Sequence, residues 1–176
     1  MLFLTPPSVE FKDSYIQAMR EYHAEDRYLY IAIPDLLADF EGHVREALSR
    51  ADPQNVPPGR VPDTQLWLID DCEFIGRVSI RHEIESNDWL RRFGGHIGYD
   101  IRPTKRRMGY GVKQLALALP YARALGLSEV LITCDEDNIG SRKIIEQNGG
   151  RFERAVKVPG EPTKLRYWIH LPRPAG

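Results

Sequence analysis

The apolar positions of the first fifty residues recur at the spacing of α-helices. The first set is preceded by Ser8, a residue type that caps helix N-termini, and the second begins next to Asp35. The first set consists of Phe11, Tyr15, Met19 and Tyr22, and the second of Leu36, Leu37, Phe40, Val44 and Leu48. This pattern predicts two helices, each with one apolar face directed at the core.

Residues 51–63 interrupt the pattern with four prolines, one glycine and few apolar side chains, which predicts a surface loop. After this loop the apolar positions alternate as they do in β-strands. Two such runs surround Asp70-Asp71 and predict a hairpin over about residues 66–84. A third strand is expected over residues 96–102, where Pro103 ends it.

The second half of the chain alternates helices and strands. A helix is expected over residues 109–125 with Gly126 at its end, and Pro120 should bend or split it, since an interior proline costs about 3 kcal/mol. The remaining elements are expected as a strand at 130–134, a helix at 138–148 and strands at 152–158 and 164–171. This order predicts an α/β or α+β fold with a mixed sheet, in one domain over residues 1–176.

The composition narrows the classes of function. Hydrophobic residues make up 42% and charged residues 28%, and 24 basic against 25 acidic side chains give a net charge of −1. Such a balance argues against a nucleic acid or an anionic membrane as partner. Cys72 and Cys134 are too few for a disulfide framework or a four-thiolate zinc site, and no apolar run reaches the length of a membrane span. We expect no metal and a cytoplasmic location, because the short apolar start is no signal peptide.

The strongest chemical signal is the turn between the strand at 96–102 and the helix at 109. It has the sequence Arg106-Arg107-Met108-Gly109-Tyr110-Gly111, and Arg102 and Lys105 add two further cations. A helix start offers free N–H donors and a partial positive charge, and glycine allows a ligand to approach the backbone, so the turn suits a pyrophosphate. It lacks P-loop spacing, and Gln114 stands where the dinucleotide fingerprint has its third glycine.

Residues 106–111 resemble the R/Q-x-x-G-x-G/A coenzyme A loop of the GNAT N-acetyltransferase superfamily. Ile101-Arg102-Pro103 stands where that family has a V/I-x-P turn. Asn138-Ile139-Gly140-Ser141 matches the family's Asn-x-x-Ser/Ala at the start of a later helix. The resemblance covers residues 96–150 by motif and the rest of the chain by element order.

This resemblance implies a sheet that splays between its two central strands, with acetyl-CoA lying between them. It implies that main-chain groups of Tyr99 and Ile101 pair with the pantetheine arm, and that Asn138 and Ser141 contact the coenzyme. The implied pyrophosphate contacts are the amides of Arg106, Arg107, Met108, Gly109, Tyr110, Gly111 and Val112.

Acetyl transfer requires a neutral amine and a donor for the developing negative charge. His96 is the candidate base, because it lies near the start of the central strand, where some GNAT enzymes place a glutamate, and because an ordinary histidine pKa is about 6.5. A structural histidine is the alternative reading. The other candidate bases are His82, Glu83 and Glu85.

The general acid is less well defined. Many family members carry a tyrosine seven residues after the asparagine, but this chain has Ile145 there. Ser141 is the candidate donor, with Cys134 and Tyr167 as alternatives, or the thiolate leaves without assistance.

The acceptor site of the family lies near the early helices, the loop after them and the last strands. The early region offers aromatic and acidic side chains, namely Tyr15, Glu21, Tyr22, Glu25, Asp26, Tyr28 and Tyr30, and the loop at 51–63 is either a lid or an idle insertion. The leading hypothesis is an N-acetyltransferase acting on an amine of a small molecule or peptide. A non-catalytic acyl-CoA-binding domain and a generic nucleotide binder are the alternatives, and a homodimer is left open.

Overall fold

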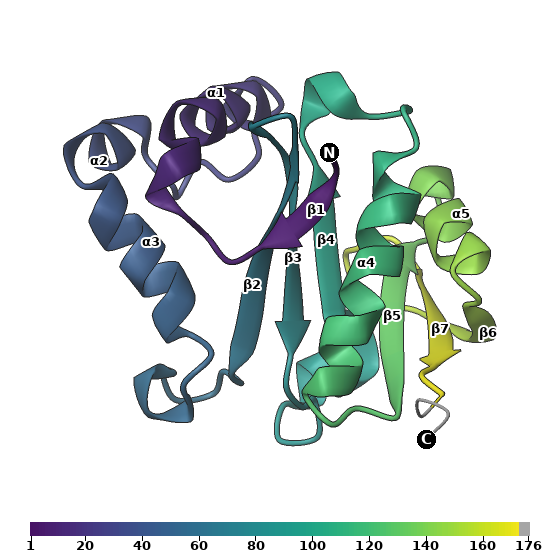
Figure 1. Ribbon diagram of the computed structural model, residues 1–176. Helices are drawn as coiled ribbons and strands as arrows, with labels where there is room; N and C mark the ends of the chain where they lie inside the picture. The colour runs from purple at the N-terminus through teal and green to yellow at the C-terminus, as the bar shows by residue number, and fades with distance from the viewer. Residues whose placement is uncertain (173–176) are drawn as a thin grey trace.

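The computed structural model, which describes residues 1–172, contains two separate β-sheets (Figure 1). The first has the order β1 (Phe3–Thr5), β2 (Asp63–Asp70), β3 (Glu73–Arg81) and β4 (Ile97–Ile101), and the second has the order β5 (Glu129–Asp135), β7 (Lys164–His170) and β6 (Arg151–Val156). Each pair of neighbours within a sheet is antiparallel. The predicted domain runs to residue 176, and residues 173–176 lie outside the described residues.

The two sheets separate between β4 and β5. These strands run in the same direction and lie side by side, but neither sheet includes both of them (Figure 1). We call this separation the splay. The predicted fold class is confirmed, and the mixed character of the sheet resides in this one parallel pair of neighbours.

Helices cover both faces of the first sheet. On one face lie α1 (Lys12–His23), α2 (Ile33–Ala38) and α3 (Phe40–Ser49), and across the other runs α4 (Tyr110–Ala124), with α5 (Ile139–Gln147) beside it (Figure 1). Short helical turns lie at Val9–Phe11, Pro53–Asn55, Leu90–Gly94 and Pro103–Lys105. Of the helices in residues 1–172, none has the length and apolarity that crossing a membrane requires.

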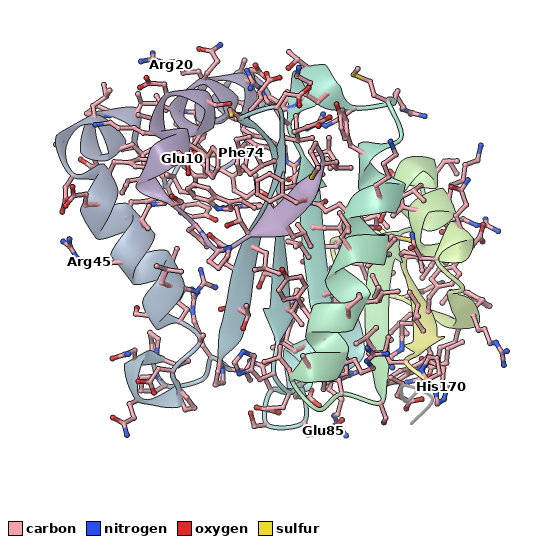
Figure 2. The ribbon with its side chains drawn as sticks, viewed as in Figure 1. Glu10, Arg20, Arg45, Phe74, Glu85 and His170 are labelled. Atoms are coloured by element: carbon pink, nitrogen blue, oxygen red, sulfur yellow. The ribbon has the colours of Figure 1, made fainter. Side chains whose placement is uncertain are left out.

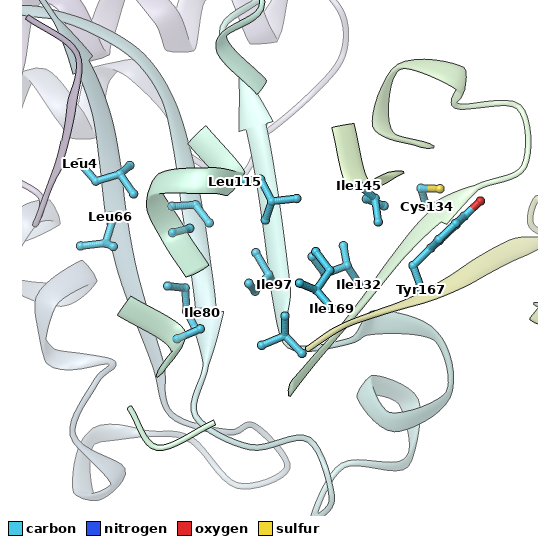
Figure 3. Packing of buried hydrophobic residues seen from close by; sticks show 14 of the residues in the cluster. Leu4, Leu66, Ile80, Ile97, Leu115, Ile132, Cys134, Ile145, Tyr167 and Ile169 are labelled. Atoms are coloured by element: carbon cyan, nitrogen blue, oxygen red, sulfur yellow. The ribbon is translucent and has the colours of Figure 1, made fainter. Parts of the chain in front are cut away.

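Alternation along β2 divides the core into two layers. Leu66 and Leu68 belong to a cluster with Leu115 of α4, whereas Trp67 and Ile69 belong to a cluster with the side chains of α1. The first cluster continues across the splay, because it includes Ile97 of β4 as well as Ile132, Ile145 and Ile169 of the C-terminal half (Figure 3). Side-chain packing therefore joins the two sheets where strand pairing does not.

The first predicted helix is confirmed. Phe11, Tyr15, Met19 and Tyr22 are all buried, and Ser8 begins a short turn ahead of α1 by accepting a hydrogen bond from the Glu10 N–H at 3.3 Å. The apolar stripe and the capping residue therefore act as the sequence indicates.

The second predicted helix is wrong as a single element. The chain leaves helical geometry at Asp39 (φ −142°, ψ 73°), whose carboxylate accepts a hydrogen bond from the Gly42 N–H at 2.7 Å and caps α3. Asp35 lies in the first turn of α2 and is not its cap. Leu37 and Leu48 of the predicted stripe face outward, and they are 52% and 44% exposed.

The later elements follow the predicted order with small shifts. The hairpin of β2 and β3 turns at Asp71 and Cys72, both at positive φ, one residue beyond the expected turn. Pro120 does not split α4, which is continuous from Tyr110 to Ala124.

Candidate active site

The splay closes at one point, where His96 meets Leu131. The His96 N–H donates to the Leu131 carbonyl at 2.7 Å, and the Leu131 N–H donates to Nδ1 of the His96 ring at 2.9 Å. Gly95 precedes this contact at φ +67°, and a Cβ there would lie 2.5 Å from the Leu131 carbonyl oxygen. The absence of a side chain at residue 95 thus allows β4 and β5 to touch before they diverge.

The hydrogen bond from Leu131 occupies one of the two ring nitrogens of His96, which limits how this residue can act as a base. Its side chain is buried, and burial, assisted by the nearby Arg81 charge, lowers its pKa to about 4. Because Nδ1 accepts a hydrogen bond, the neutral ring carries its proton on Nε2. Uptake of a second proton would displace the Leu131 N–H. The catalytic role of His96 stays a prediction, and its structural role is visible.

The other candidate bases lie beyond the end of β3. His82 Nε2 is 2.8 Å from the Thr64 hydroxyl, and the Glu83 carboxylate accepts hydrogen bonds from the N–H and hydroxyl of Ser86. Glu85 is exposed and points away from the molecule (Figure 2).

One edge of β4 faces the splay with free main-chain groups. The His96 carbonyl accepts from Arg81 and the Arg102 N–H donates to Ile75, so alternate residues of β4 bond to β3. Tyr99 and Ile101, which lie between them, direct their main-chain groups away from β3. Of these groups, the Ile101 carbonyl accepts a hydrogen bond from the Arg106 side chain at 3.1 Å.

The loop before α4 presents a row of amides. From residue 107 to residue 112, no N–H group donates to an acceptor within residues 1–172. Arg107 and Gly109 both have positive φ, 63° and 82°, a conformation that recurs in loops that bind anions through successive amides. The Arg106 N–H differs, because it donates to the Pro103 carbonyl at 3.3 Å. Six of the seven predicted amides are therefore available to an anion.

Glycine is needed at residues 109 and 111 for two different structural reasons. Gly109 is required by its positive φ, and a Cβ there would meet no atom within 4 Å, so the space above it is open. At Gly111 a Cβ would lie 2.4 Å from Cδ1 of Ile144, so this glycine allows α4 to pack against α5.

Most cations of the loop are paired with carboxylates of the N-terminal half. Arg102 bonds to Glu21 at 2.6 Å, and Arg106 bonds to Glu25 at 2.9 Å. Lys105 and Arg102 both reach Glu73. Arg102, Lys105 and Arg106 are thus each paired with a carboxylate, and Arg107 is the cation of this loop that stays exposed without a carboxylate in residues 1–172.

Glu21 of α1 and Glu25, which lies two residues beyond the end of α1, both pair with cations of the loop before α4. Burial opposes ionisation of Glu21, but hydrogen bonds from Arg102 and Thr104 outweigh it and lower the pKa of this carboxyl. Glu21 and Glu25 thus hold the loop against α1.

The start of α5 lies across the splay from β4. Asn138 caps this helix by accepting from the Ser141 N–H at 3.0 Å, and the Tyr99 and Ser141 hydroxyl oxygens are 2.8 Å apart. Burial raises the pKa of Tyr99, so its hydroxyl keeps its proton at neutral pH. This pair of hydroxyls connects β4 with the start of α5 across the splay.

Residue 145 and the two alternative proton donors, Cys134 and Tyr167, are all buried. Ile145 is fully buried in the core, and Cys134 is buried in the same cluster, where desolvation raises its thiol pKa to about 11. The Tyr167 hydroxyl is 3.4 Å from a Glu146 carboxylate oxygen. No cluster of three or more metal-ligating side chains is present in the part of the chain that the structure describes.

A cavity of about 270 Å³ lies on the α1–α3 face of the first sheet, next to β4. Its lining includes Tyr28, Tyr30, Arg77, Gly98, Tyr99 and Asp100. A neighbouring cavity of about 520 Å³ shares Tyr30 and Arg77 and extends along α2 and α3. Two of the aromatic residues expected at the acceptor site thus line a cavity, whereas Tyr15 and Tyr22 are fully buried in the core. None of residues 51–63 lines either cavity.

The architecture is that of an acetyltransferase fold, with a splayed pair of central strands and an amide-rich loop at the start of the following helix. Residues 4–151 match the family model described as an acetyltransferase (GNAT) domain. This match spans most of the chain, and the protein therefore belongs to the GNAT acetyltransferase family.

Solved structures of acetyltransferases share the fold at low sequence identity. The microcin C7 self-immunity acetyltransferase MccE, in complex with acetyl-CoA and AMP, is 12% identical, with 96% of this chain and 92% of that chain covered and a TM-score of 0.67. An acetyltransferase from Salmonella typhimurium that modifies the N-terminal serine of a ribosomal protein is 16% identical, with coverages of 97% and 95% and a TM-score of 0.64. The aminoglycoside acetyltransferase AAC(6')-Ib, in complex with coenzyme A and kanamycin, is 12% identical, with coverages of 97% and 95% and a TM-score of 0.65. None of the curated proteins matches the chain.

Proposed function

We propose that this protein is an acetyl-CoA-dependent N-acetyltransferase, which transfers an acetyl group to a primary amine of a small molecule or peptide by direct attack. The observation that carries the proposal is the row of six free amides at the start of α4, in a family whose members are acetyltransferases. A pyrophosphate is an anion that such a row of donors binds.

The chain's own groups fit the coenzyme along its length. The amides of residues 107–112 would hold the pyrophosphate, and the main-chain groups of Tyr99 and the N–H of Ile101 would pair with the pantetheine arm. Arg106 would contribute through its guanidinium, which already lies on the Ile101 carbonyl. Asn138 and Ser141 would contact the coenzyme from α5. When bound, acetyl-CoA supplies the thioester carbonyl and a thiolate leaving group.

We assign proton donation to Ser141, whose hydroxyl is held by Tyr99 at the open end of the splay. A hydroxyl there can donate to a thiolate or to an oxyanion. For His96 to act as the base, its ring must give up the hydrogen bond from Leu131. An amine that is already neutral when it enters the site requires no such step, and positioning then supplies the rate.

The solved neighbours act on a ribosomal protein or bind an aminoglycoside, and this range supports both a peptide and a small molecule as the class of acceptor. A cytoplasmic location and a homodimer stay predictions.

The test measures binding and turnover separately. Acetyl-CoA should raise the melting temperature, whereas ATP and NAD should not, because a ligand of the native state stabilises it. Thiol release from acetyl-CoA should then depend on an added amine. Binding without thiol release across a broad amine panel would favour the non-catalytic acyl-CoA-binding alternative, and stabilisation by ATP or NAD alone would refute both.

A further inference from the structure

The polar side of β3 forms the wall of the cavity next to β4. Arg77 and Arg81 project from β3 to the α1–α3 face, and Arg50 projects from the end of α3 into the same space. Asp100 is the acid of the lining, and it is already neutralised. Its carboxylate accepts from Arg27 at 2.5 Å and from the Tyr28 hydroxyl at 2.6 Å. The cavity therefore has an excess of positive charge.

Two of these three arginines have fixed partners. Arg50 pairs with the buried Asp63 at 2.7 Å, and Arg81 donates to the Gly94 and Gly95 carbonyls at 3.3 and 2.9 Å. The Arg50 charge is therefore balanced by Asp63, whereas Arg81 is held by neutral carbonyls and adds its positive charge to the cavity.

Arg77 differs from both, because within residues 1–172 its guanidinium is neither paired with a carboxylate, as Arg50 is, nor bonded to main-chain carbonyls, as Arg81 is. It stacks on the Tyr28 ring, 3.8 Å from the ring centroid. Stacking fixes the plane of a guanidinium but leaves its N–H donors at the edge for a ligand. Tyr28 is itself held by its hydrogen bond to Asp100 and by a backbone at φ +57°. Arg77 is thus a preorganised cation with no carboxylate partner in the described residues.

The cavity extends from Arg77 to β4, the strand along which the coenzyme is proposed to lie. Gly98 and Tyr99 of β4 form part of the same lining, and a Cβ at Gly98 would meet only the ends of Arg81. The main-chain groups of Tyr99 face the splay. An acceptor whose amine lies near Gly98 and Tyr99 can therefore direct a second group toward Arg77.

The charges of the neighbouring cavity make it a less favourable place for an anionic group of the acceptor. Its lining contains the carboxylates of Asp35, Asp39 and Glu46, which would repel an anion. Arg50 and Arg77 line both cavities, whereas Arg81 lines only the one next to β4, whose single carboxylate, Asp100, is already paired. An anionic group is therefore favoured in the cavity next to β4. The volume of about 270 Å³ suits a small molecule.

We infer that the acetyl acceptor carries an anionic group, a carboxylate or a phosphate, close to its amine, and that Arg77 binds this group and determines acceptor specificity. This inference rests on the proposed acetyltransferase function. Both anions present oxygen pairs that match the edge of a guanidinium.

The experiment uses matched acceptors that differ in one group. Thiol release is measured with amino carboxylates and with their carboxamides, with aminoalkyl phosphates and with the corresponding amino alcohols, and with diamines. We expect kcat/KM to be about 100-fold higher for one anionic series than for its neutral partner, the size expected for a charged hydrogen bond. The carboxylate and phosphate series identify which anion is preferred. Preference for diamines or for the neutral members would overturn the inference.

Substitution of Arg77 separates recognition from folding. Arg77→Met should lower kcat/KM about 100-fold for the anionic acceptor, mainly through KM, and change the neutral acceptor less than about 3-fold. Arg77→Lys should recover part of the loss, because it restores the charge without the planar edge. Arg20→Met is the matched control, since Arg20 is exposed on α1 and points away from the cavity (Figure 2). An equal loss for both acceptors in Arg77→Met would contradict the assignment.

A binding measurement covers the case in which no acceptor turns over. Calorimetry with the coenzyme A complex should show the anionic acceptor binding more tightly than its neutral partner, and Arg77→Met should remove the difference. If coenzyme A itself does not bind, the proposed function fails. If it binds and the two acceptors bind equally, only the inference about Arg77 fails.

Discussion

His96 and Leu131 exchange two hydrogen bonds, and one of them uses the His96 ring in place of a second main-chain group. The ring nitrogen extends strand pairing by one bond and then allows β4 and β5 to part. Because this bond needs an unprotonated Nδ1, the protonation of one side chain is coupled to the joint between the sheets.

Stability should therefore depend on pH through His96. The folded pKa is about 4, below the ordinary 6.5, so the unfolded chain binds the proton more readily. The contribution is fully present above pH 6.5 and is lost as pH falls toward 4, up to roughly 3 kcal/mol in the free energy of unfolding. Urea unfolding at several pH values, compared between the wild type and His96→Asn, should show this slope in the wild type only. An equal slope in both proteins would contradict it.

The same variant tests His96 as a base. Loss of a general base lowers the rate by about 100- to 10,000-fold. If His96 only joins the sheets, His96→Asn should keep kcat within about 3-fold of the wild type at pH 7.5, because an asparagine oxygen can accept from Leu131. A loss of the larger size in a folded variant would establish the catalytic role.

Gly109 should be needed for the coenzyme beyond its effect on folding. Gly109→Ala places a Cβ at φ +82° in the open space above the amides, and should cost about 1–2 kcal/mol of stability and more than about 10-fold in coenzyme A affinity. Gly126→Ala is the matched control, since Gly126 has φ +90° and an equally open surrounding at the other end of α4. Equal affinities in the two variants would exclude the loop as the pyrophosphate site.

Asn138 should act both as a helix cap and as a coenzyme contact. Asn138→Ala should cost about 1 kcal/mol of stability and weaken coenzyme A binding. Asp39→Ala removes a similar cap from α3 and should cost as much stability with no change in affinity. Thermal unfolding and calorimetry of both variants separate the two effects, and unchanged affinity in Asn138→Ala would leave the residue a cap alone.

The hydroxyl pair of Tyr99 and Ser141 should affect turnover. Tyr99→Phe and Ser141→Ala should each cost about 1 kcal/mol of stability and lower kcat. KM for acetyl-CoA should change little in Tyr99→Phe and should rise in Ser141→Ala, which also loses a coenzyme contact. Tyr121→Phe removes a hydroxyl elsewhere, 3.4 Å from the Leu4 carbonyl, and should leave kcat unchanged. A wild-type kcat in Ser141→Ala would indicate that the thiolate leaves without this donor.

The sequence pattern predicted those elements whose structure depends on residues close together in the chain. Ser8 and the stripe of α1, the β2–β3 hairpin and the loop before α4 all depend on residues close in sequence. The break at Asp39 was hidden because the apolar stripe continues in phase across it. A capping residue in the middle of the stripe was the available signal.

Longer-range pairings were not predictable in this way. The carboxylates that neutralise Arg102 and Arg106 are 81 residues away along the chain, so the cluster of cations looked free. Arg77 occupies an alternating position in a strand, where a polar residue usually faces solvent. Its surroundings are set by Tyr28 and Asp100, which come from other parts of the chain.

The division at the splay follows the order of synthesis. The first sheet is complete at residue 101, and the core under α1–α3 is built entirely from residues 11–74. The second sheet begins only at residue 129. A nascent chain can therefore pair every strand of its first sheet before any strand of the second has left the ribosome, and the loop before α4 is translated in the interval between them.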